Sequence, residues 1–228
     1  MSIQKLALPI YELTLPMSGK VIKFRPFTVK ENKILMMAKE ENNIDSFINA
    51  IGQLFDACTF GTYSIDTMNK LDAEFMFIAL RNKSLGEGLD VNGICTDCGK
   101  KTAITLNLEN FTIKNKDVKM ELELSEGVWL KMRMPTLKES LSITDQDGYT
   151  AIAMCLDTLI DADGSTNMLE YPIADRIEWV ESLSPVSFAA FKDFFEKVPM
   201  LEYNFDFKCA HCGVKNDIHI EGMESFFG

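Results

Sequence analysis

Residues from which most active sites are built are scarce in this sequence. Only two histidines and two tryptophans occur among its 228 residues. We find no Gly-x-x-x-x-Gly-Lys-Ser/Thr loop and no Gly-x-Gly-x-x-Gly turn, which are motifs that bind phosphate groups. No apolar run approaches the ~20 residues that cross a bilayer, and Pro9 interrupts the first one before a secretory signal could form. We therefore expect neither an enzyme nor a membrane-bound protein.

Positive charge is scarce too. The 23 lysines and arginines are outnumbered by 34 aspartates and glutamates, which gives a formal net charge of -11. A protein that binds nucleic acid needs a dense basic face toward the phosphates, so this balance argues against a nucleic-acid partner. Apolar residues make up 46% of the chain, which is enough to bury a core without disulfide bonds.

The most informative feature of the sequence is an internal repeat. Gly19 begins the run Gly-Lys-Val-Ile-Lys-Phe-Arg-Pro-Phe-Thr-Val-Lys-Glu, and Gly127 begins Gly-Val-Trp-Leu-Lys-Met-Arg-Met-Pro-Thr-Leu-Lys-Glu. Six residue types coincide at this offset of 108 positions. A Cys-x-x-Cys-Gly motif that starts at Cys95 recurs 114 positions later, at Cys209. Two matched features in the same order predict that the chain is internally duplicated.

Each half is predicted to begin with a β-hairpin that leads into a helix. The hairpin strands are expected at residues 11–15 and 21–24 in the first half, and at residues 120–124 and 128–132 in the second. A capping box marks the start of the helix in both halves: Thr28 with Glu31, and Thr136 with Glu139. In such a box the threonine oxygen and the glutamate carboxylate each accept a hydrogen bond from a backbone N–H at the helix start.

Further helices are predicted from apolar residues at helical spacing. The second helix would carry Ile44, Phe47, Ile48, Ile51, Leu54, Phe55 and Cys58 in the first half, and Tyr149, Ile152, Ala153, Leu156, Leu159 and Ile160 in the second. The third would carry Leu71, Phe75, Ile78 and Ala79, and then Phe188, Phe191 and Phe195. An extra helical segment is expected around residues 173–181 of the second half.

Each half is predicted to end in a strand, a Cys-x-x-Cys turn and a return strand. The alternation is clearest at residues 201–208, where apolar and polar side chains take turns. The expected fold class is therefore α+β and internally duplicated. We place the first pseudo-repeat at residues 1–110 and the second at residues 111–228.

The two cysteine pairs predict a metal site. Cys95 with Cys98, and Cys209 with Cys212, offer four thiolates, the soft ligands that zinc binds at tetrahedral corners. The glycine after each second cysteine suits the positive φ of a tight turn. Residues 99–208 separate the pairs, a longer gap than a zinc ribbon usually has, but the duplication explains it because each half donates half of the site. We predict one structural Zn²⁺ ion held by all four cysteines in a zinc-ribbon-like site.

Other interpretations of these residues stay open. A redox Cys-x-x-Cys usually opens a helix, whereas these pairs are predicted between strands, so a thiol oxidoreductase is disfavoured. Disulfides between the pairs would require oxidation. His211 lies inside the second motif and could replace a cysteine as ligand, whereas His219 is expected on a strand in a structural role. A zinc-ribbon protein that binds nucleic acid is a further alternative. Cys58 and Cys155 are expected in the core as small apolar residues.

Two acidic segments and one apolar segment remain to be interpreted. Asp145-Gln-Asp147-Gly148 and Asp161-Ala-Asp163-Gly164 faintly resemble calcium-binding loops. Both lack the full ligand spacing and its final glutamate, so we expect turns. The apolar Phe226 and Phe227 can fold back on the core or dock a partner.

Residues 15–38 resemble the opening of the T-even-type bacteriophage baseplate hub family, above all in the run Phe-Arg-Pro-Phe followed by Lys-Glu. The likeness continues through residues 75–86, where Leu-Arg-Asn-Lys-Ser is similar to a Leu-Arg-x-Lys-Ser element of that family. It is strongest over the first half of the chain.

This resemblance implies a structural or assembly role and no catalytic activity. The chain would be a non-enzymatic structural component of a contractile-tail baseplate hub, with other baseplate and hub proteins as its partners. Its place would be the tail baseplate of the virion, after a phase in the host cytoplasm during assembly. The alternative is a chaperone that assists hub assembly and is absent from the mature particle.

Overall fold

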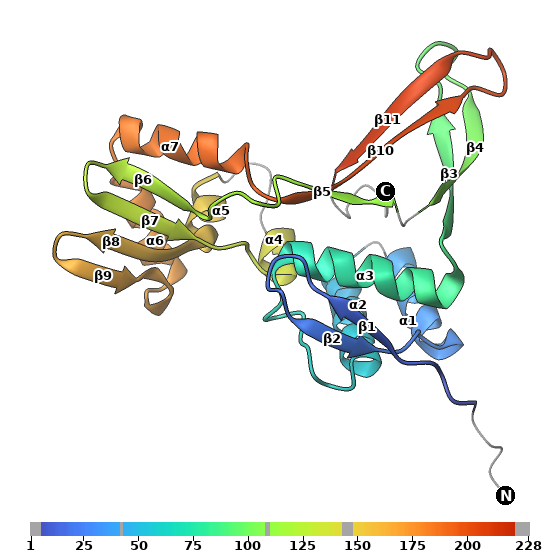
Figure 1. Ribbon diagram of the computed structural model, residues 1–228, viewed down its shortest axis with the longest axis horizontal. Helices are drawn as coiled ribbons and strands as arrows, with labels where there is room; N and C mark the ends of the chain where they lie inside the picture. Colours follow the sequence, from blue (N-terminus) through green and yellow to red (C-terminus); the bar gives the residue numbers. More distant parts are fainter. Residues whose placement is uncertain (1–5, 42, 108–109, 143–147, 222–228) are drawn as a thin grey trace, which may run out of the picture. The chain divides into compact units, whose positions relative to one another are not determined.

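The computed structural model describes residues 6–41, 43–107, 110–142 and 148–221, and the chain divides into two compact units (Figure 1). Unit 1 combines Met1–Ser64, Asp72–Lys114 and Met200–Gly228. Unit 2 combines Ile65–Leu71 and Asn115–Pro199. Both mix helices with small antiparallel sheets, which confirms the expected combination of α and β structure.

Unit 1 begins with a β-hairpin followed by three helices. Strands β1 (Tyr11–Thr14) and β2 (Val21–Phe24) pair with each other, and helices α1 (Val29–Glu40), α2 (Ile44–Cys58) and α3 (Lys70–Leu85) follow. The predicted hairpin and three helices of the first half are thus confirmed. Strand β2 shows why the hairpin forms, because Ile22 and Phe24 alternate with exposed residues and are 0% and 2% exposed.

Helix α1 begins at the predicted capping box. The Thr28 hydroxyl accepts a hydrogen bond from the Glu31 N–H at 3.4 Å, and the Glu31 carboxylate accepts one from the Thr28 N–H at 2.6 Å. Arg25 then donates two hydrogen bonds to the same carboxylate, at 3.0 and 2.7 Å. The Arg25 N–H donates to the carbonyl of Cys58 at 3.0 Å. This network joins the end of the hairpin, the start of α1 and the end of α2.

The buried face of α2 supplies much of the apolar interior of unit 1. Its buried residues include Ile48, Ile51, Leu54, Phe55 and Cys58, which follow the predicted helical spacing. Full burial of such a side chain contributes roughly 1.5–3 kcal/mol. Ile44, at the first position of the helix, stays exposed. The helix is therefore held by its apolar face rather than by propensity alone.

Glu31→Gln is expected to remove part of the acid sensitivity of unit 1. The hydrogen bond from Arg25 lowers the pKa of Glu31 from 4.5 to about 2 in the folded chain. The ionised carboxylate therefore stabilises the fold fully above pH ~4.5, and this contribution is lost as the pH falls toward ~2. We expect the variant to be less stable by ~1–3 kcal/mol near pH 7, and to lose less stability between pH ~4.5 and ~2.

Urea denaturation across this pH range measures the effect. Glu12→Gln is the matched control, because the Glu12 carboxylate forms an exposed ion pair with Lys23. Parallel stability profiles for the wild type and Glu31→Gln would contradict the prediction.

Unit 2 is a four-stranded sheet accompanied by helices. The strand order is β6 (Glu121–Ser125), β7 (Val128–Met132), β8 (Leu156–Asp161) and β9 (Gly164–Asn167). The helices are α4 (Leu137–Ser142), α5 (Gly148–Cys155), the short η2 (Met168–Glu170), α6 (Ile173–Glu181) and α7 (Pro185–Phe195). The predicted hairpin and the helices at 173–181 and 188–195 are confirmed. Nowhere in the described ranges does a helix combine the length and apolar character needed to cross a membrane.

The second helix of the second half is shorter than the sequence predicts. Helix α5 ends at Cys155, and strand β8 begins at Leu156, so the prediction is wrong for residues 156–160. A short apolar run fits both helical spacing and a buried strand. Pairing with β7 decides between them, because it satisfies the backbone groups of this segment and leaves Leu156 fully buried.

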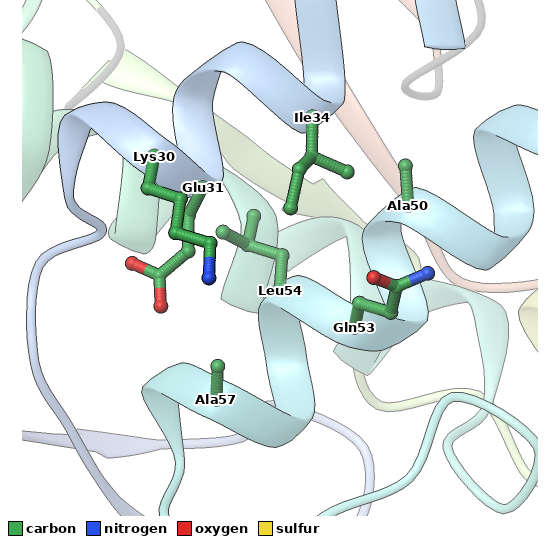
Figure 2. Close-up of a pocket in the computed structure, with 7 residues that line it drawn as sticks. All are labelled: Lys30, Glu31, Ile34, Ala50, Gln53, Leu54 and Ala57. Atoms are coloured by element: carbon green, nitrogen blue, oxygen red, sulfur yellow. The ribbon is translucent and has the colours of Figure 1, made fainter.

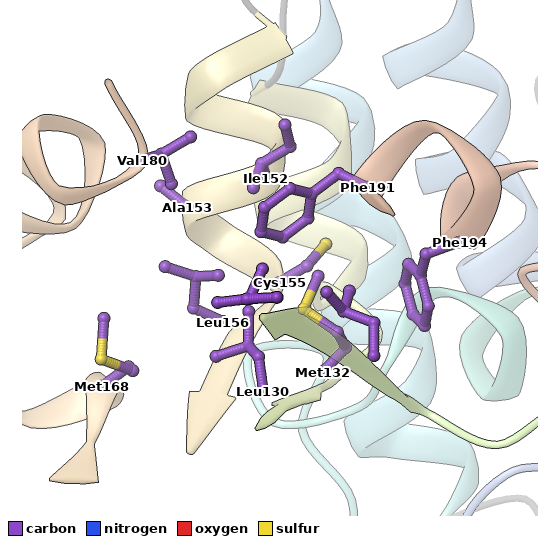
Figure 3. Packing of buried hydrophobic residues seen from close by; sticks show 12 residues of the cluster. Leu130, Met132, Ile152, Ala153, Cys155, Leu156, Met168, Val180, Phe191 and Phe194 are labelled. Carbon is purple, nitrogen blue, oxygen red and sulfur yellow. The ribbon is translucent and has the colours of Figure 1, made fainter. Parts of the chain in front are cut away.

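One apolar cluster forms the core of unit 2 (Figure 3). It gathers side chains from the sheet, from the short helix η2 and from helices α5, α6 and α7: Leu122, Leu124, Leu130, Met132, Ile152, Ala153, Cys155, Leu156, Met168, Val180, Phe191 and Phe194. Phe191 is 1% exposed, and its ring centroid lies 6.2 Å from that of Phe188. At the turn from β8 to β9, the Asp161 carboxylate accepts hydrogen bonds from two backbone N–H groups, which confirms the predicted turn.

The contacts made by Arg25 have counterparts around Arg133. Arg133 donates to both carboxylate oxygens of Glu139, at 2.8 and 2.7 Å, and its N–H donates to the carbonyl of Cys155 at 2.8 Å. Glu139 and Thr136 exchange the two hydrogen bonds of the second predicted capping box. In each unit, an equivalent arginine–glutamate ion pair therefore joins a hairpin to the next helix. The N–H of the same arginine joins the hairpin to the end of the helix after that.

The boundaries of the pseudo-repeats, 1–110 and 111–228, stay a prediction. Pseudo-repeats are defined by segments with equivalent local structure, whereas the compact units are defined by which segments pack together. Packing assigns Met200–Gly228 to unit 1, although this segment belongs to the second half of the sequence. Two further predictions, the turn at 145–147 and the apolar Phe226 and Phe227, lie outside the described residues.

Candidate metal centre

Two β-hairpins of unit 1 carry the cysteine pairs in the turns at their tips (Figure 1). Their strands are β3 (Gly88–Ile94) with β4 (Lys101–Asn107), and β10 (Met200–Lys208) with β11 (Lys215–Glu221), while β5 (Thr112–Lys114) pairs with β10 as well. Ile94 is opposite Lys101 and Lys208 is opposite Lys215, so each cysteine pair follows the last ladder position. The predicted strand–turn–strand arrangement is confirmed in both halves.

The two cysteine turns have the same backbone geometry. In the first, the Cys95 N–H donates to the Lys100 carbonyl at 3.0 Å, and the Gly99 N–H donates to the Cys95 carbonyl at 3.0 Å. In the second, the corresponding bonds of Cys209 and Gly213 measure 2.9 and 3.0 Å. The two glycines have φ of 69° and 78°, a region that other residues rarely adopt. We call each of these turns a knuckle, residues 95–99 and 209–213.

The knuckles bring all four sulfur atoms together. The Sγ atoms of Cys95 and Cys212 lie 3.5 Å apart, and those of Cys98 and Cys209 lie 3.7 Å apart. All four ligand atoms lie within 4.8 Å of one another. Four sulfurs at ~2.3 Å from one tetrahedral ion would be ~3.8 Å apart, and a disulfide would bring two of them to ~2.05 Å. The spacing therefore fits a shared metal ion, and all six cysteines of the chain are free thiols.

Hydrogen bonds favour the thiolate form of the first cysteine in each knuckle. The pKa of Cys209 is lowered to about 5, chiefly because the Cys212 N–H donates to its sulfur. The pKa of Cys95 is lowered in the same way by the Cys98 N–H. A hydrogen bond from the Val214 N–H lowers the pKa of Cys212, but desolvation and the hydrogen bonds with the other three sulfurs together outweigh it and raise this pKa to about 12. Four adjacent thiolates repel one another, so a cation is needed before all four lose their protons.

Two polar residues beside the sulfurs were not predicted from the sequence. The Thr102 hydroxyl lies 3.7 Å from the sulfur of Cys209, and the Asn216 amide nitrogen lies 3.5 Å from the sulfur of Cys95. Both are buried, at 9% and 3% exposure. One weak signal could have revealed them, since they are 114 positions apart, as Cys95 and Cys209 are.

The two histidines lie outside the four-sulfur group. The Nε2 atom of His211 is 3.2 Å from the carbonyl oxygen of Lys101, on the exposed side of the second knuckle. His219 lies on β11, and its ring is hydrogen-bonded to the Asn204 side chain on β10. Among the described residues, the metal-competent group consists of the four cysteines. His211 is thus placed against backbone rather than among the ligands.

Glycine at position 93 allows the two hairpins to approach each other. A Cβ atom there would lie 2.4 Å from Cδ1 of Ile104 and 2.8 Å from Cζ of Phe207. Such distances are too short for any real side chain at this position, so the Phe207 ring occupies the space beside the Gly93 backbone. Gly93 and Phe207 are also 114 positions apart. The Phe207 ring thus fits because the matching position, Gly93, has no side chain.

A small pocket lies between α1 and α2 (Figure 2). It is lined by Lys30, Glu31, Ile34, Ala50, Gln53, Leu54 and Ala57. The carboxylate of Glu31 is already bound by Arg25 and Thr28, so it serves to cap the helix. The cysteine cluster is therefore the stronger candidate for a functional site.

Comparison with known proteins places this chain in a family of phage baseplate proteins. The chain belongs to the T4 bacteriophage base plate protein family, whose sequence profile matches residues 8–228. The match covers both hairpin–helix regions and both knuckles, and it confirms the resemblance found in the sequence.

A particular relative is similar along nearly its whole length. The baseplate hub assembly protein gp26 of Enterobacteria phage T4 is 26% identical over 219 residues, which cover 95% of this chain and 97% of gp26. No solved structure matches the chain.

Proposed function

We propose that this chain is a non-enzymatic protein of the contractile-tail baseplate hub, held in shape by one structural zinc ion. Family membership over residues 8–228 supports the baseplate role. The similarity to a hub assembly protein over 97% of that protein supports the hub as its place of action. Other baseplate and hub proteins would be its partners, and the virion tail its destination.

The convergence of four sulfur atoms is the observation that carries the zinc proposal. Cys95, Cys98, Cys209 and Cys212 form a set of four soft ligands at tetrahedral spacing, which is typical of structural zinc. A catalytic zinc keeps a coordination position for water, whereas four cysteines fill the shell. The donor set therefore supports a structural ion and a protein without zinc chemistry.

The ion would act as a clasp between distant parts of the sequence. The first knuckle belongs to the hairpin of β3 and β4, and the second belongs to the hairpin of β10 and β11. Zinc bound by both would fix these hairpins to each other within unit 1. Because such a site rarely exists in the unfolded chain, its binding energy becomes folding energy.

Internal duplication accounts for a site that is divided in this way. Each knuckle contains the same two backbone hydrogen bonds. The ion pair of Arg25 with Glu31 also has an equivalent in the pair of Arg133 with Glu139. We propose that each pseudo-repeat contributes one hairpin–helix region and one knuckle. The zinc ion would then lie on the pseudo-twofold axis that relates the two knuckles.

Two fates in the mature particle are compatible with this role. The resemblance found in the sequence leaves both open, and the first candidate is a component that remains in the baseplate. The description of gp26 as an assembly protein favours a second candidate, an assembly chaperone that leaves before the particle is complete.

Quantitative mass spectrometry separates these fates. Peptides of this chain would be measured in isolated baseplate intermediates and in purified virions, relative to other baseplate proteins. We expect the chain in the intermediates in either case. A fixed ratio in virions would assign it to the structure, and depletion by tenfold or more would assign it to assembly. Absence from the intermediates as well would refute the hub proposal.

A further inference from the structure

We propose that Thr102 and Asn216 are positioning residues of the metal site, each of which holds the knuckle of the opposite hairpin. This inference rests on the proposed zinc ion but concerns residues that are not ligands. Thr102 lies on β4, just after the first knuckle, and Asn216 lies on β11, just after the second. Each side chain reaches across to the other hairpin.

Thr102 binds the second knuckle at two points. Its hydroxyl accepts a hydrogen bond from the Ala210 N–H at 3.2 Å and donates toward the sulfur of Cys209 at 3.7 Å. A hydroxyl has one proton to donate and lone pairs to accept, so both contacts can exist together. The residue thus fixes the first turn of the knuckle and supplies a donor to its first thiolate.

Asn216 binds the first knuckle in the matching way. Its amide oxygen accepts hydrogen bonds from the N–H and the hydroxyl of Thr96, at 2.8 and 2.9 Å. Its amide nitrogen donates to the sulfur of Cys95 at 3.5 Å and to the Val214 carbonyl at 3.0 Å. All four hydrogen-bonding positions of the amide are therefore used, although the side chain is 3% exposed.

The two sets of contacts are reciprocal. In each, a buried polar side chain accepts from the backbone of the residue after the first cysteine and donates to that cysteine's sulfur. Thr102 and Asn216 are 114 positions apart, as are the two knuckles. Two chemically different residues therefore make equivalent contacts at equivalent positions. Burying either would be unfavourable without these bonds, so the hydrogen-bonding groups rather than packing explain their presence.

These contacts would control how tightly the metal is held. A donor to a thiolate stabilises its negative charge and fixes the direction of the sulfur toward the ion. Each donor comes from the hairpin that does not carry the thiolate, so the contacts form only when the knuckles are together. Loss of such a partner typically weakens metal binding by ~10–100-fold.

Substitutions that keep the shape but change the hydrogen bonds provide the test. Thr102→Val removes both contacts at nearly constant volume, whereas Thr102→Ser retains the hydroxyl. Thr105→Val is the matched control, because Thr105 is an exposed threonine on the same strand that binds Asp90. Asn216→Leu removes all the contacts of Asn216, and Asn204→Leu is the corresponding control on β10.

Zinc affinity would be measured on the full chain by competition with a chelator of known affinity, and Co²⁺ would be bound as a spectroscopic probe. We expect Thr102→Val and Asn216→Leu to bind zinc ~10–100-fold more weakly. Thr102→Ser and both controls should bind like the wild type. The Co²⁺ charge-transfer bands should still report four thiolates in every variant, because no ligand has been removed.

Each other outcome has a definite meaning. Wild-type affinity in Thr102→Val would overturn this inference, as would an equal loss in Thr102→Ser, which would indicate packing instead. If Asn216→Leu does not fold, as judged by circular dichroism, Asn216→Asp takes its place in the comparison. This substitution exchanges the amide nitrogen for an oxygen, so it keeps an acceptor and removes both donors. Should the wild-type chain itself bind neither Zn²⁺ nor Co²⁺, the proposed zinc ion would fail and this inference with it, a result that is distinct from wild-type affinity in the variants.

Discussion

Cys209→Ser is expected to abolish stable zinc binding and to loosen both hairpins of the metal site together. The wild-type chain should carry one zinc ion by elemental analysis, and the variant close to none after dialysis against a chelator. Structural zinc contributes roughly 10–16 kcal/mol of binding free energy in small zinc domains, and this energy is coupled to folding. With ~2–4 °C per kcal/mol for a chain of this size, we expect the thermal midpoint of unit 1 to fall by ~20 °C or more.

Amide hydrogen exchange shows whether one ion joins the two hairpins. Residues 88–107 and 200–221 should both exchange faster in Cys209→Ser, although the substitution lies in only one of them. Cys58→Ala is the control for zinc content, because Cys58 is a free cysteine of unit 1 outside the cluster. If zinc content stayed at one ion and only residues 200–221 were affected, the shared-site proposal would be wrong.

Phe191→Ala is expected to cause the largest loss of stability in unit 2. The Phe191 side chain is 1% exposed and belongs to the apolar cluster that includes the sheet and helices α5 to α7. Truncation removes its apolar contacts and leaves a cavity that the neighbours fill only in part. Substitutions of this kind cost ~3–5 kcal/mol, a large share of the stability of an ordinary domain.

Chemical denaturation followed by circular dichroism measures this change. Val186→Ala is the matched control on the same helix, because Val186 is 83% exposed and its truncation should change stability by no more than ~0.5 kcal/mol. Since the cysteine cluster lies in unit 1, we expect the folded Phe191→Ala protein to keep its full zinc content. A loss of less than ~1 kcal/mol would show that the cluster around Phe191 repacks or contributes little.

The segments that were predicted well are those governed by near neighbours. The capping box at Thr28 needs only Glu31, three residues on, and both of its hydrogen bonds are present. The knuckle at Cys95 is closed by hydrogen bonds to residues no more than five positions away. Interactions at this range are visible in the sequence, because residue type and spacing determine them almost completely.

Residues 156–160 were predicted incorrectly because their conformation depends on a distant partner. Their apolar spacing suits a helix, and the preceding residues do form α5. The neighbouring strand β7 lies more than 20 positions earlier, and its pairing with β8 favours the extended form. Propensity is a weak signal when a tertiary partner competes for the same backbone groups.

The sequence by itself determined the helix starts at Thr28 and Thr136, the two cysteine turns and their matching pattern, because each depends on residues within a few positions. The duplication predicted that the two pairs share one site, but only the tertiary structure showed that this site lies within unit 1 and that Thr102 and Asn216 bind the opposite knuckles. Those contacts join residues more than 100 positions apart, and spacing along the chain does not reveal which distant groups share a buried environment. Packing and the need to satisfy buried polar groups made that selection.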